Sequence, residues 1–314
     1  MQTVQNKNFL ENDLPDKSMQ LIIADPPYYK IKGEFDFIWD SLEDYLKDVE
    51  KWAIECKRLL ADNGTLFWYG HAKNIAYSQI ILDKHFNLVN SLVWEKIECQ
   101  TLKCRPSDLR MFAPVTERVL MYDNGQDVSG LQRINDDIEL FLPIKQYFDD
   151  WLDASGLSLK EAVKYIGSTS THWFGFTKRE KVQFMFPTIE KWSKMGEIHG
   201  HSKEYESLRQ EYESLRRTFN LQTMQTDVLK FSQETHITSK YDHETKKPET
   251  LTRLFIITCS KKGDNLFVPF AGSGTECAMG LKEGLNVWGY DISPKHCKTA
   301  NDRCEIIKAN PTLF

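Results

Sequence analysis

The sequence predicts an α/β protein in which a mostly parallel sheet, covered by helices on both faces, is interrupted by a helical insertion. Strand and helix patterns alternate at both ends of the 314-residue chain, as is typical of parallel sheets with helical crossovers. The middle of the chain shows helical patterns with little strand signal. We therefore expect one α/β domain formed by residues 1–125 and 236–314, with an insert at residues 126–235.

The two outer parts contain the expected strands. Residues 20–24 are mostly apolar and predict a buried strand, while the amphipathic pattern of residues 43–60 predicts a helix closed by Asn63-Gly64. The other expected strands lie at 65–69, 88–94, 118–122, 265–268 and 286–290. The other expected helices lie at 73–84, 248–260, 276–282 and from 294 onward.

The insert contains four expected helices, at 138–152, 159–166, 188–195 and 203–219. The last includes a near-identical heptad pair, KEYESLR-QEYESLR, whose apolar residues form a stripe along one helix face. Two heptads are too few for a coiled coil, so we favour a helix docked on its own domain, with a dimer contact as the alternative. Residues 156–219 hold 7 Lys and 4 Arg against 8 Glu, although the whole chain carries −5, and this indicates a local anion-binding face or simply a solvated helical surface.

Composition excludes several classes of protein. No apolar run approaches the roughly 20 residues that span a bilayer, and the amino terminus has no apolar segment of a secretion signal. Seven scattered cysteines suit a reducing cytoplasm better than a disulfide framework. Cys99 and Cys104 lack the further ligands of a zinc site. We expect a cytoplasmic protein, encoded by a bacterium or phage, without a membrane segment or a metal.

The stretch Asp25-Pro26-Pro27-Tyr28 directly follows the expected strand at 20–24. Proline has no N–H to donate, so two prolines in succession end the sheet ladder abruptly. In open α/β sheets, ligands bind at the carboxyl ends of the strands. The pattern therefore predicts a functional turn, although a strand ending in such a turn is by itself more often structural.

A second turn joins the strand at 265–268 to a helix and reads Phe270-Ala271-Gly272-Ser273-Gly274-Thr275. Glycines here let a ligand approach the backbone and the helix amino terminus. Asp291 ends the next strand, about 20 residues further on, where an acid can hold ribose hydroxyls. A third glycine and a Gly-Lys-Ser/Thr sequence are absent, so a nucleoside without phosphates, such as S-adenosylmethionine, fits better than NAD or ATP.

These two turns, in this order and separated by an insert, resemble the β class of DNA amino-methyltransferases. His243-Glu244-Thr245-Lys246-Lys247-Pro248 resembles a further element of that family, beside the methionine end of the cofactor. The resemblance implies a Rossmann-like S-adenosylmethionine-dependent methyltransferase sheet with a circularly permuted motif order, yielding S-adenosylhomocysteine as product. It implies cofactor contacts from Asn8, Asp25, Lys247, Pro248, the turn at 270–275 and Asp291. Glu117 resembles another acid of the family, to which we assign no catalytic role.

The resemblance also implies a reaction. Adenine N6 is a poor nucleophile because its lone pair is delocalised into the ring, and acceptors from the Asp25 carboxylate and the Pro26 carbonyl would draw the nitrogen toward a tetrahedral shape. Pro27 holds the turn rigid and Tyr28 stacks on the base, which must be flipped out of the duplex. Asp at the first motif position favours adenine N6 over cytosine N4. Cytosine-N4 methylation, a catalytically inactive DNA-binding relative and a protein or RNA methyltransferase are the alternatives.

Double-stranded DNA is the expected partner, with a homodimer and a cognate restriction endonuclease as further possibilities. Residues 158–174 resemble a helix-turn-helix, whose second helix would enter the major groove; an ordinary helical hairpin is the alternative. The residues expected to contact DNA are Ser168, Thr169, Ser170, Thr171, His172, Lys178, Arg179 and Lys181 in the insert, together with Arg105 and Arg110.

Overall fold

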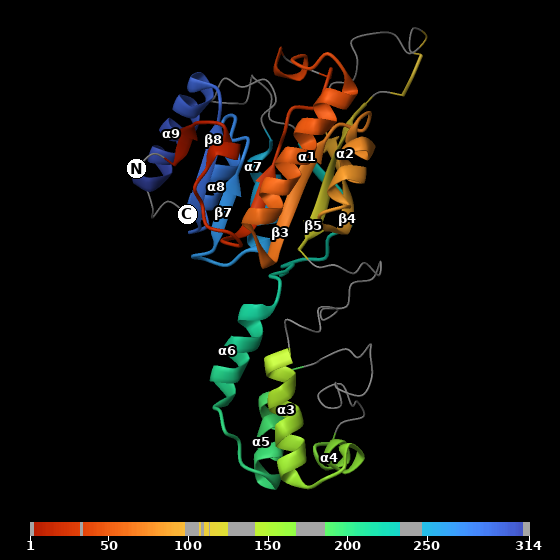
Figure 1. Cartoon of the computed structure of the whole chain (residues 1–314), viewed down its shortest axis with the longest axis vertical. Helices are drawn as coiled ribbons and strands as arrows, with labels where there is room; N and C mark the ends of the chain where they lie inside the picture. The colour runs from red at the N-terminus through yellow and green to blue at the C-terminus, as the bar shows by residue number, and fades with distance from the viewer. Residues whose placement is uncertain are drawn as a thin grey trace. The chain divides into compact units, whose positions relative to one another are not determined.

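The computed structural model describes residues 3–31, 34–97, 107, 110–112, 114–124, 142–167, 186–232 and 247–309. The chain divides into two compact units. Unit 1 comprises Met1–Gly125 and Arg217–Phe314, and unit 2 comprises Gln126–Arg216. Figure 1 shows both units, which are described separately below.

Among the described residues, unit 1 contains an eight-stranded sheet with the order β1-β8-β7-β2-β3-β5-β4-β6. The strand β5 runs antiparallel to both of its neighbours, and every other pairing is parallel. The predicted α/β class with a mostly parallel sheet is thereby confirmed. The strands are β1 (Val4–Asn6), β2 (Met19–Ala24), β3 (Leu60–Gly70), β4 (Asn87–Ile97), β5 (Thr116–Asp123), β6 (Val228–Ser232), β7 (Asn265–Val268) and β8 (Asn286–Asp291).

Helices cover both faces of the sheet because its central strands are apolar on both sides. Leu21 and Ile23 of β2 pack with the helices α7 (Glu249–Cys259), α8 (Thr275–Lys282) and α9 (Pro294–Ala309). Ile22 and Ala24, which point to the opposite face, pack with α1 (Leu42–Leu59) and α2 (Ile75–Leu82), which lie side by side in Figure 1. Alternate residues of one strand therefore anchor two separate cores.

Two strands differ from the sequence-based assignment. The strand β1 has three residues and was not expected, because so short a segment shows no periodicity. The strand β6 lies within the range assigned to the insert, yet it pairs in parallel with β4, and unit 2 ends at Arg216 rather than at residue 235. The short 3-10 helices η1 (Phe9–Glu11) and η2 (Glu34–Asp36) complete the described elements of unit 1.

Unit 2 has its own aromatic-rich core, formed by α3 (Leu142–Ser155), α4 (Leu159–Tyr165), α5 (Ile189–Ile198) and α6 (Tyr205–Leu215). The heptad stripe on α6 packs into this core through Tyr205, Leu208 and Tyr212, as the docked-helix interpretation predicts. Phe219, the last residue of the helix expected at 203–219, lies beyond the end of α6 and belongs to unit 1. In the described part of both units, no helix is long and apolar enough to cross a membrane.

Candidate active site

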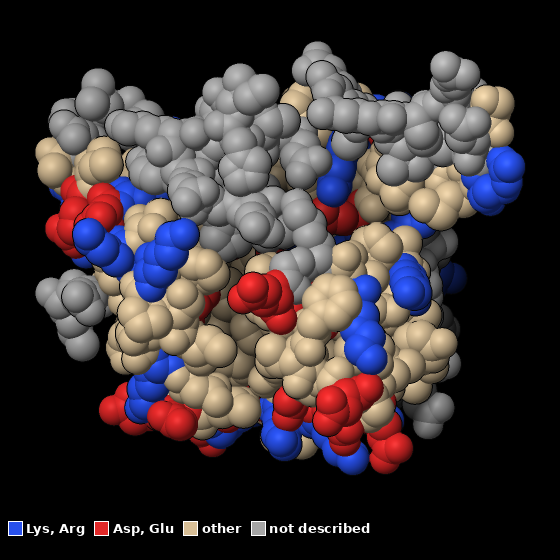
Figure 2. Space-filling model, turned by 90° about the horizontal axis from the view of Figure 1, so that it is seen from above, with Lys and Arg blue, Asp and Glu red and all other residues tan. Residues whose placement is uncertain are grey.

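The candidate site lies where four parallel strands end together. Because β1, β8, β7 and β2 are neighbours and run in the same direction, their carboxyl ends meet at one edge of the sheet. The segments that follow them contribute Asn8, Asp291, Gly272 and Asp25 to the lining of one cavity of about 810 Å³. Figure 2 views the side of the molecule on which the loop after β2 lies and shows a hollow bordered by acidic side chains. The two predicted turns therefore share a cavity.

The turn Asp25–Tyr28 is held by side chains from two other segments. The Tyr28 amide donates to Asp36 Oδ1 at 2.6 Å, and Asp36 is buried. Asn74 donates through Nδ2 to the carbonyls of Tyr28 and Tyr29 at 2.6 and 2.7 Å. Tyr29 and Lys30 have φ values of 57° and 52°, an uncommon conformation for non-glycine residues. These contacts fix a strained backbone directly after the prolines, so the turn is preorganised.

A buried cluster of charged side chains surrounds Asp25. The Lys247 ammonium lies 2.9 Å from Asp25 Oδ1 and 3.1 Å from Glu117 Oε2. The Tyr28 hydroxyl donates to Asp25 Oδ1 at 2.5 Å and accepts from Lys247 at 2.9 Å. Glu117 Oε1 lies 2.5 Å from Lys96 Nζ. All five side chains line the cavity, and they come from distant parts of the chain.

The cluster sets the protonation of its members. Burial raises the pKa of Asp25 above its usual value, although the nearby Lys247 charge and the Tyr28 hydrogen bond oppose this shift. Burial would also raise the pKa of Glu117, but Lys247 and Lys96 outweigh it and lower that pKa to about 2. Burial would lower the pKa of Lys247, but its two carboxylate partners raise it. At neutral pH, Glu117 and Lys247 are therefore charged.

The glycine turn requires its glycines for different reasons. Gly272 and Gly274 have φ values of 48° and 76°, which favour glycine. A Cβ atom on Gly274 would lie 2.6 Å from Ala300 Cβ, so this glycine also permits close packing of α9. The Gly272 amide donates to Asp291 Oδ2 at 2.9 Å, and the Ser293 amide donates to Asp291 Oδ1 at 2.8 Å. Asp291 thus ties the turn to the end of β8.

The Asp291 carboxylate stays ionised in this setting. Burial alone would raise its pKa, but hydrogen bonds from His296, Ser293 and Gly272 lower the pKa below the usual value. Oδ1 accepts from Ser293 and His296, whereas Oδ2 accepts only from Gly272 among the described residues and has a further lone pair for a ligand hydroxyl. The side chain can therefore accept from ribose at the cavity wall without giving up either backbone contact.

Only some of the predicted cofactor residues reach the cavity. Phe270 and Gly272 line it, whereas Ser273 and Thr275 are buried with their polar groups close to Arg303. Ala271 is buried and Gly274 packs against Ala300, so both belong to the turn but do not line the cavity. Pro248 is the N-cap residue of α7 and does not line the cavity either. The predicted residues that line the cavity are Asn8, Asp25, Pro26, Pro27, Tyr28, Lys247, Phe270, Gly272 and Asp291.

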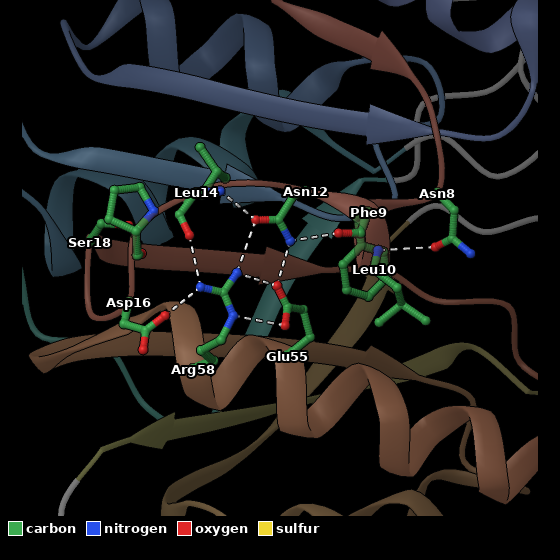
Figure 3. Close-up of polar contacts among 10 residues, drawn as sticks. Asn8, Phe9, Leu10, Asn12, Leu14, Asp16, Ser18, Glu55 and Arg58 are labelled. Carbon is green, nitrogen blue, oxygen red and sulfur yellow. Dashed lines mark hydrogen bonds and ion pairs between the residues drawn. The ribbon is translucent and has the colours of Figure 1, made fainter.

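The segment that carries Asn8 is tied to α1 by a polar network, shown in Figure 3. Arg58 donates to the Leu14 carbonyl at 2.8 Å, to Asn12 Oδ1 at 3.1 Å and to Glu55. Asn12 in turn donates to the Phe9 carbonyl at 2.7 Å. Asn8 caps η1 by accepting from the Leu10 amide through Oδ1, which leaves its NH₂ group for a ligand. The network therefore holds one wall of the cavity.

The apolar and charged residues that line the cavity indicate the kind of ligand it can hold. Phe9, Phe270 and Ile292 give one end an apolar surface, and the rings of Phe9 and Phe270 pack edge to face at 5.2 Å. Six acidic side chains and four lysines also line the cavity. The acids are Asp25, Glu34, Asp36, Asp48, Glu117 and Asp291, and the lysines are Lys7, Lys51, Lys96 and Lys247. A ligand with a flat aromatic part, hydroxyls and positive charge suits such walls. In the described part of the chain, no group of His, Cys, Asp and Glu residues is arranged to hold a metal ion.

The residues predicted to bind DNA fall mainly outside the described part of the chain. These are Arg105, Ser168, Thr169, Ser170, Thr171, His172, Lys178, Arg179 and Lys181. Arg110 is described and exposed, and its guanidinium donates to the Ser107 carbonyl at 3.0 Å. The first helix of the expected helix-turn-helix is α4, which begins with a capping box between Ser158 and Glu161.

Several residues around Asp25 lie outside the sequence motifs. No motif includes Lys96 or Asp36, and Glu117 resembles a family acid to which we assign no catalytic role. Asp36 follows the Asp25–Tyr28 turn by only eight residues, and this closeness in sequence is the signal that could have identified it. For Lys96 no local pattern distinguishes the residue from an ordinary surface charge on β4. Glu117, on β5, is marked only by its resemblance to an acid of the family.

Comparisons with known proteins agree with the geometry. Residues 19–302 match the family described as DNA methylase. The type II methyltransferase M.HinfI of Haemophilus influenzae is 24% identical over 95% of this chain, which spans 66% of that enzyme. The DNA adenine methyltransferase YhdJ of Escherichia coli (strain K12) is 23% identical over 93% of this chain and 78% of that enzyme.

The fold also matches a solved structure. The crystal structure of the M1.HpyAVI–SAM complex superposes with a TM-score of 0.52 at 15% identity, covering 96% of this chain and 98% of that chain. This similarity supports the fold predicted from the sequence. Since the family match extends over most of the chain, the family predicted from the sequence is confirmed, and the chain belongs to the DNA methylase family.

Proposed function

We propose that this protein transfers a methyl group from S-adenosylmethionine to the N6 amine of an adenine flipped out of double-stranded DNA. The observation that carries the proposal is that Asp25 and Gly272, from the two sequence motifs, line one cavity. YhdJ is named a DNA adenine methyltransferase, which favours adenine over cytosine. M1.HpyAVI was solved with SAM, which supports the same cofactor here.

The walls of the cavity fit the cofactor. Asp291 lines the cavity and supplies an acceptor for the ribose hydroxyls, and Phe9 and Phe270 supply an apolar surface for the adenine ring. The six acidic side chains of the lining outnumber its four lysines, and this excess favours a cation. S-adenosylmethionine, when bound, supplies a methyl group on a positively charged sulfur.

The residues of the turn prepare the substrate amine. The Asp25 carboxylate and the Pro26 carbonyl accept hydrogen bonds from the two N–H groups, which directs the nitrogen lone pair away from them. Asp25 and Pro26 both line the cavity. In the product one N–H is replaced by N–CH₃ and one proton is released. Catalysis then depends on placement and on electrostatics rather than on a strong base.

The described α3–α6 core belongs to unit 2, and we propose that the insert reads the DNA target through the helix-turn-helix-like region 158–174. DNA is the partner common to the family. The homodimer, the cognate restriction endonuclease and the cytoplasmic location stay predictions. They would be tested by the mass of the complex in solution, by neighbouring genes and by cell fractionation.

The direct test is mass spectrometry of nucleosides from DNA treated with the purified protein and S-adenosylmethionine. We expect N6-methyladenine in the wild-type reaction and a loss on the order of 10²–10³ in the single-turnover rate of Asp25→Ala. N4-methylcytosine would replace the adenine assignment with the cytosine alternative. Absence of methylated bases, together with no cofactor binding by calorimetry, would support an inactive DNA-binding relative. Glu305→Gln, an exposed substitution on α9, is the matched control.

A further inference from the structure

Lys247 is bound more completely by its neighbours than a cofactor ligand would be. An ammonium group has three N–H donors. Three acceptors surround Nζ, namely Asp25 Oδ1 at 2.9 Å, Glu117 Oε2 at 3.1 Å and the Tyr28 hydroxyl at 2.9 Å. The Lys247 side chain is 4% exposed. All its donors are therefore used within the protein, and none is left for a cofactor carboxylate.

The two oxygens of Asp25 have different environments. Oδ1 accepts from both Lys247 and the Tyr28 hydroxyl. Oδ2 has no hydrogen-bond partner within the described part of the chain. Since Asp25 lines the cavity, Oδ2 is the oxygen available to a substrate amine. The contacts at Oδ1 fix the orientation in which Oδ2 is presented.

Glu117 in turn fixes the position of the Lys247 ammonium group. One of its oxygens contacts Lys247 and the other contacts Lys96, and the side chains of Glu117 and Lys96 are each only 14% exposed. Lysine has a long, flexible side chain, so an ammonium group bound at one point only would not hold a fixed position. The ion pairs form a chain from β4 through β5 and the segment before α7 to the end of β2.

We propose that Lys247, anchored by Glu117 and Lys96, is a positioning residue that fixes the Asp25 carboxylate so that Oδ2 accepts a hydrogen bond from the substrate amine. This deepens the proposed function and rests on it. It replaces the cofactor contact that the sequence resemblance implied for Lys247. It also gives Glu117 a role that requires no contact with the reacting atoms.

The proposal has an electrostatic consequence. The charged or titratable groups that act on Asp25 are Lys247, Tyr28, Glu117, Tyr69 and Glu276. Of these, Lys247 lowers the pKa of Asp25 and Glu117 raises it. Removing Lys247 would leave Asp25 protonated at higher pH, and a protonated carboxyl oxygen donates a hydrogen bond where an acceptor is needed. Removing the Glu117 charge shifts the pKa of Asp25 in the opposite direction.

The test compares Lys247→Met, Glu117→Gln and the exposed control Lys47→Met in the full chain. Carboxyl ¹³C NMR of aspartate-labelled protein reports the titration of Asp25, whose resonance is identified by its loss in Asp25→Asn. We expect the Asp25 midpoint to rise by roughly 1–3 pH units in Lys247→Met. It should fall in Glu117→Gln, and Lys47→Met should leave it unchanged. This measurement does not depend on methylation, so it stands even if the proposed function fails.

Two further measurements separate positioning from cofactor binding. Calorimetry with S-adenosylhomocysteine should give wild-type affinity for Lys247→Met, while the acidic limb of its single-turnover pH profile moves to higher pH. Glu117→Gln should lower the methylation rate at saturating cofactor. A weakened S-adenosylhomocysteine affinity with an unmoved pH profile and an unmoved Asp25 midpoint would make Lys247 a cofactor ligand and overturn the proposal. If Lys247→Met fails to fold, the rate and midpoint of Glu117→Gln decide the matter, since an unchanged rate overturns it.

Discussion

Glu276 provides the most direct test of the electrostatics behind the site. The residue lies in the first turn of α8 and is 5% exposed. Its Oε1 has only a long contact, 3.5 Å, with the Thr252 hydroxyl. Burial, with a smaller contribution from the Asp25 charge, raises the pKa of Glu276 from 4.5 to about 7. We predict that Glu276→Gln stabilises the protein at alkaline pH and has little effect at acidic pH.

The sign and the size follow from linkage. Below pH 4.5 the carboxyl group is protonated in both the folded and the unfolded state, so it adds no pH dependence. Between pH 4.5 and about pH 7 the folded state holds a proton that the unfolded state has lost, so the free energy of unfolding falls as pH rises. One pKa unit corresponds to about 1.4 kcal/mol, so the loss between pH 5 and pH 8 is roughly 2–3 kcal/mol. Glutamine, which is neutral throughout, removes this loss.

The assay is urea denaturation of wild type and Glu276→Gln at pH 5 and pH 8. We expect the difference in unfolding free energy between the two proteins to move in favour of the variant by roughly 2–3 kcal/mol from pH 5 to pH 8. Glu43→Gln, whose side chain is 82% exposed, serves as the control and should show no such change. An equal destabilisation by Glu276→Gln at both pH values would mean that the carboxyl group is ionised and paired in the folded protein, which contradicts the reasoning.

Three further predictions concern the cofactor side of the cavity. Gly274→Ala places a Cβ atom 2.6 Å from Ala300 Cβ at a φ of 76°, and we expect thermal denaturation to show a loss of about 2–4 kcal/mol. Arg58→Ala breaks the network of Figure 3, so calorimetry should show weaker cofactor binding while the methylation rate at saturating cofactor is retained; a reduced rate with normal affinity would contradict this. Asp291→Asn deprives the Gly272 or Ser293 amide of a carboxylate acceptor, and we expect calorimetry to show a roughly tenfold fall in cofactor affinity. An unchanged affinity would mean that the ribose lies elsewhere.

The motifs of the site could be predicted because each is local. The residues Asp25-Pro26-Pro27-Tyr28 and Gly272-Ser273-Gly274 each combine a strand end with residues of restricted or unusual backbone conformation, and such combinations are visible within ten residues of sequence. Parallel strands then bring the two ends to the same edge, so shared position follows from fold class alone. The prediction that both motifs line one cavity therefore followed from the α/β fold, which the structure confirms.

Boundaries were harder to predict, for a different physical reason. The helical pattern of residues 203–219 continues beyond the observed end of α6 at Leu215, because periodicity records apolar spacing and not which core each residue enters. Tyr205, Leu208 and Tyr212 enter the core of unit 2, whereas Phe219 lies in unit 1. The five residues of β6 are too few for their apolar–polar alternation to predict a strand. The strand is recognised only through its pairing with β4.

The charged cluster could not be predicted because it depends on contacts between residues far apart in sequence. Lys247 and Glu117 are 130 positions apart, and Lys247 and Tyr28 are 219 apart, so no periodicity links them. Burying one such charge alone would be strongly unfavourable, and the arrangement is stable only because the partners are buried together. A cavity that holds the ionised Glu117 beside Asp25 therefore requires a compensating cation from elsewhere in the chain. This requirement follows from the fold and the chemistry jointly, and the structure identifies Lys247 as that cation.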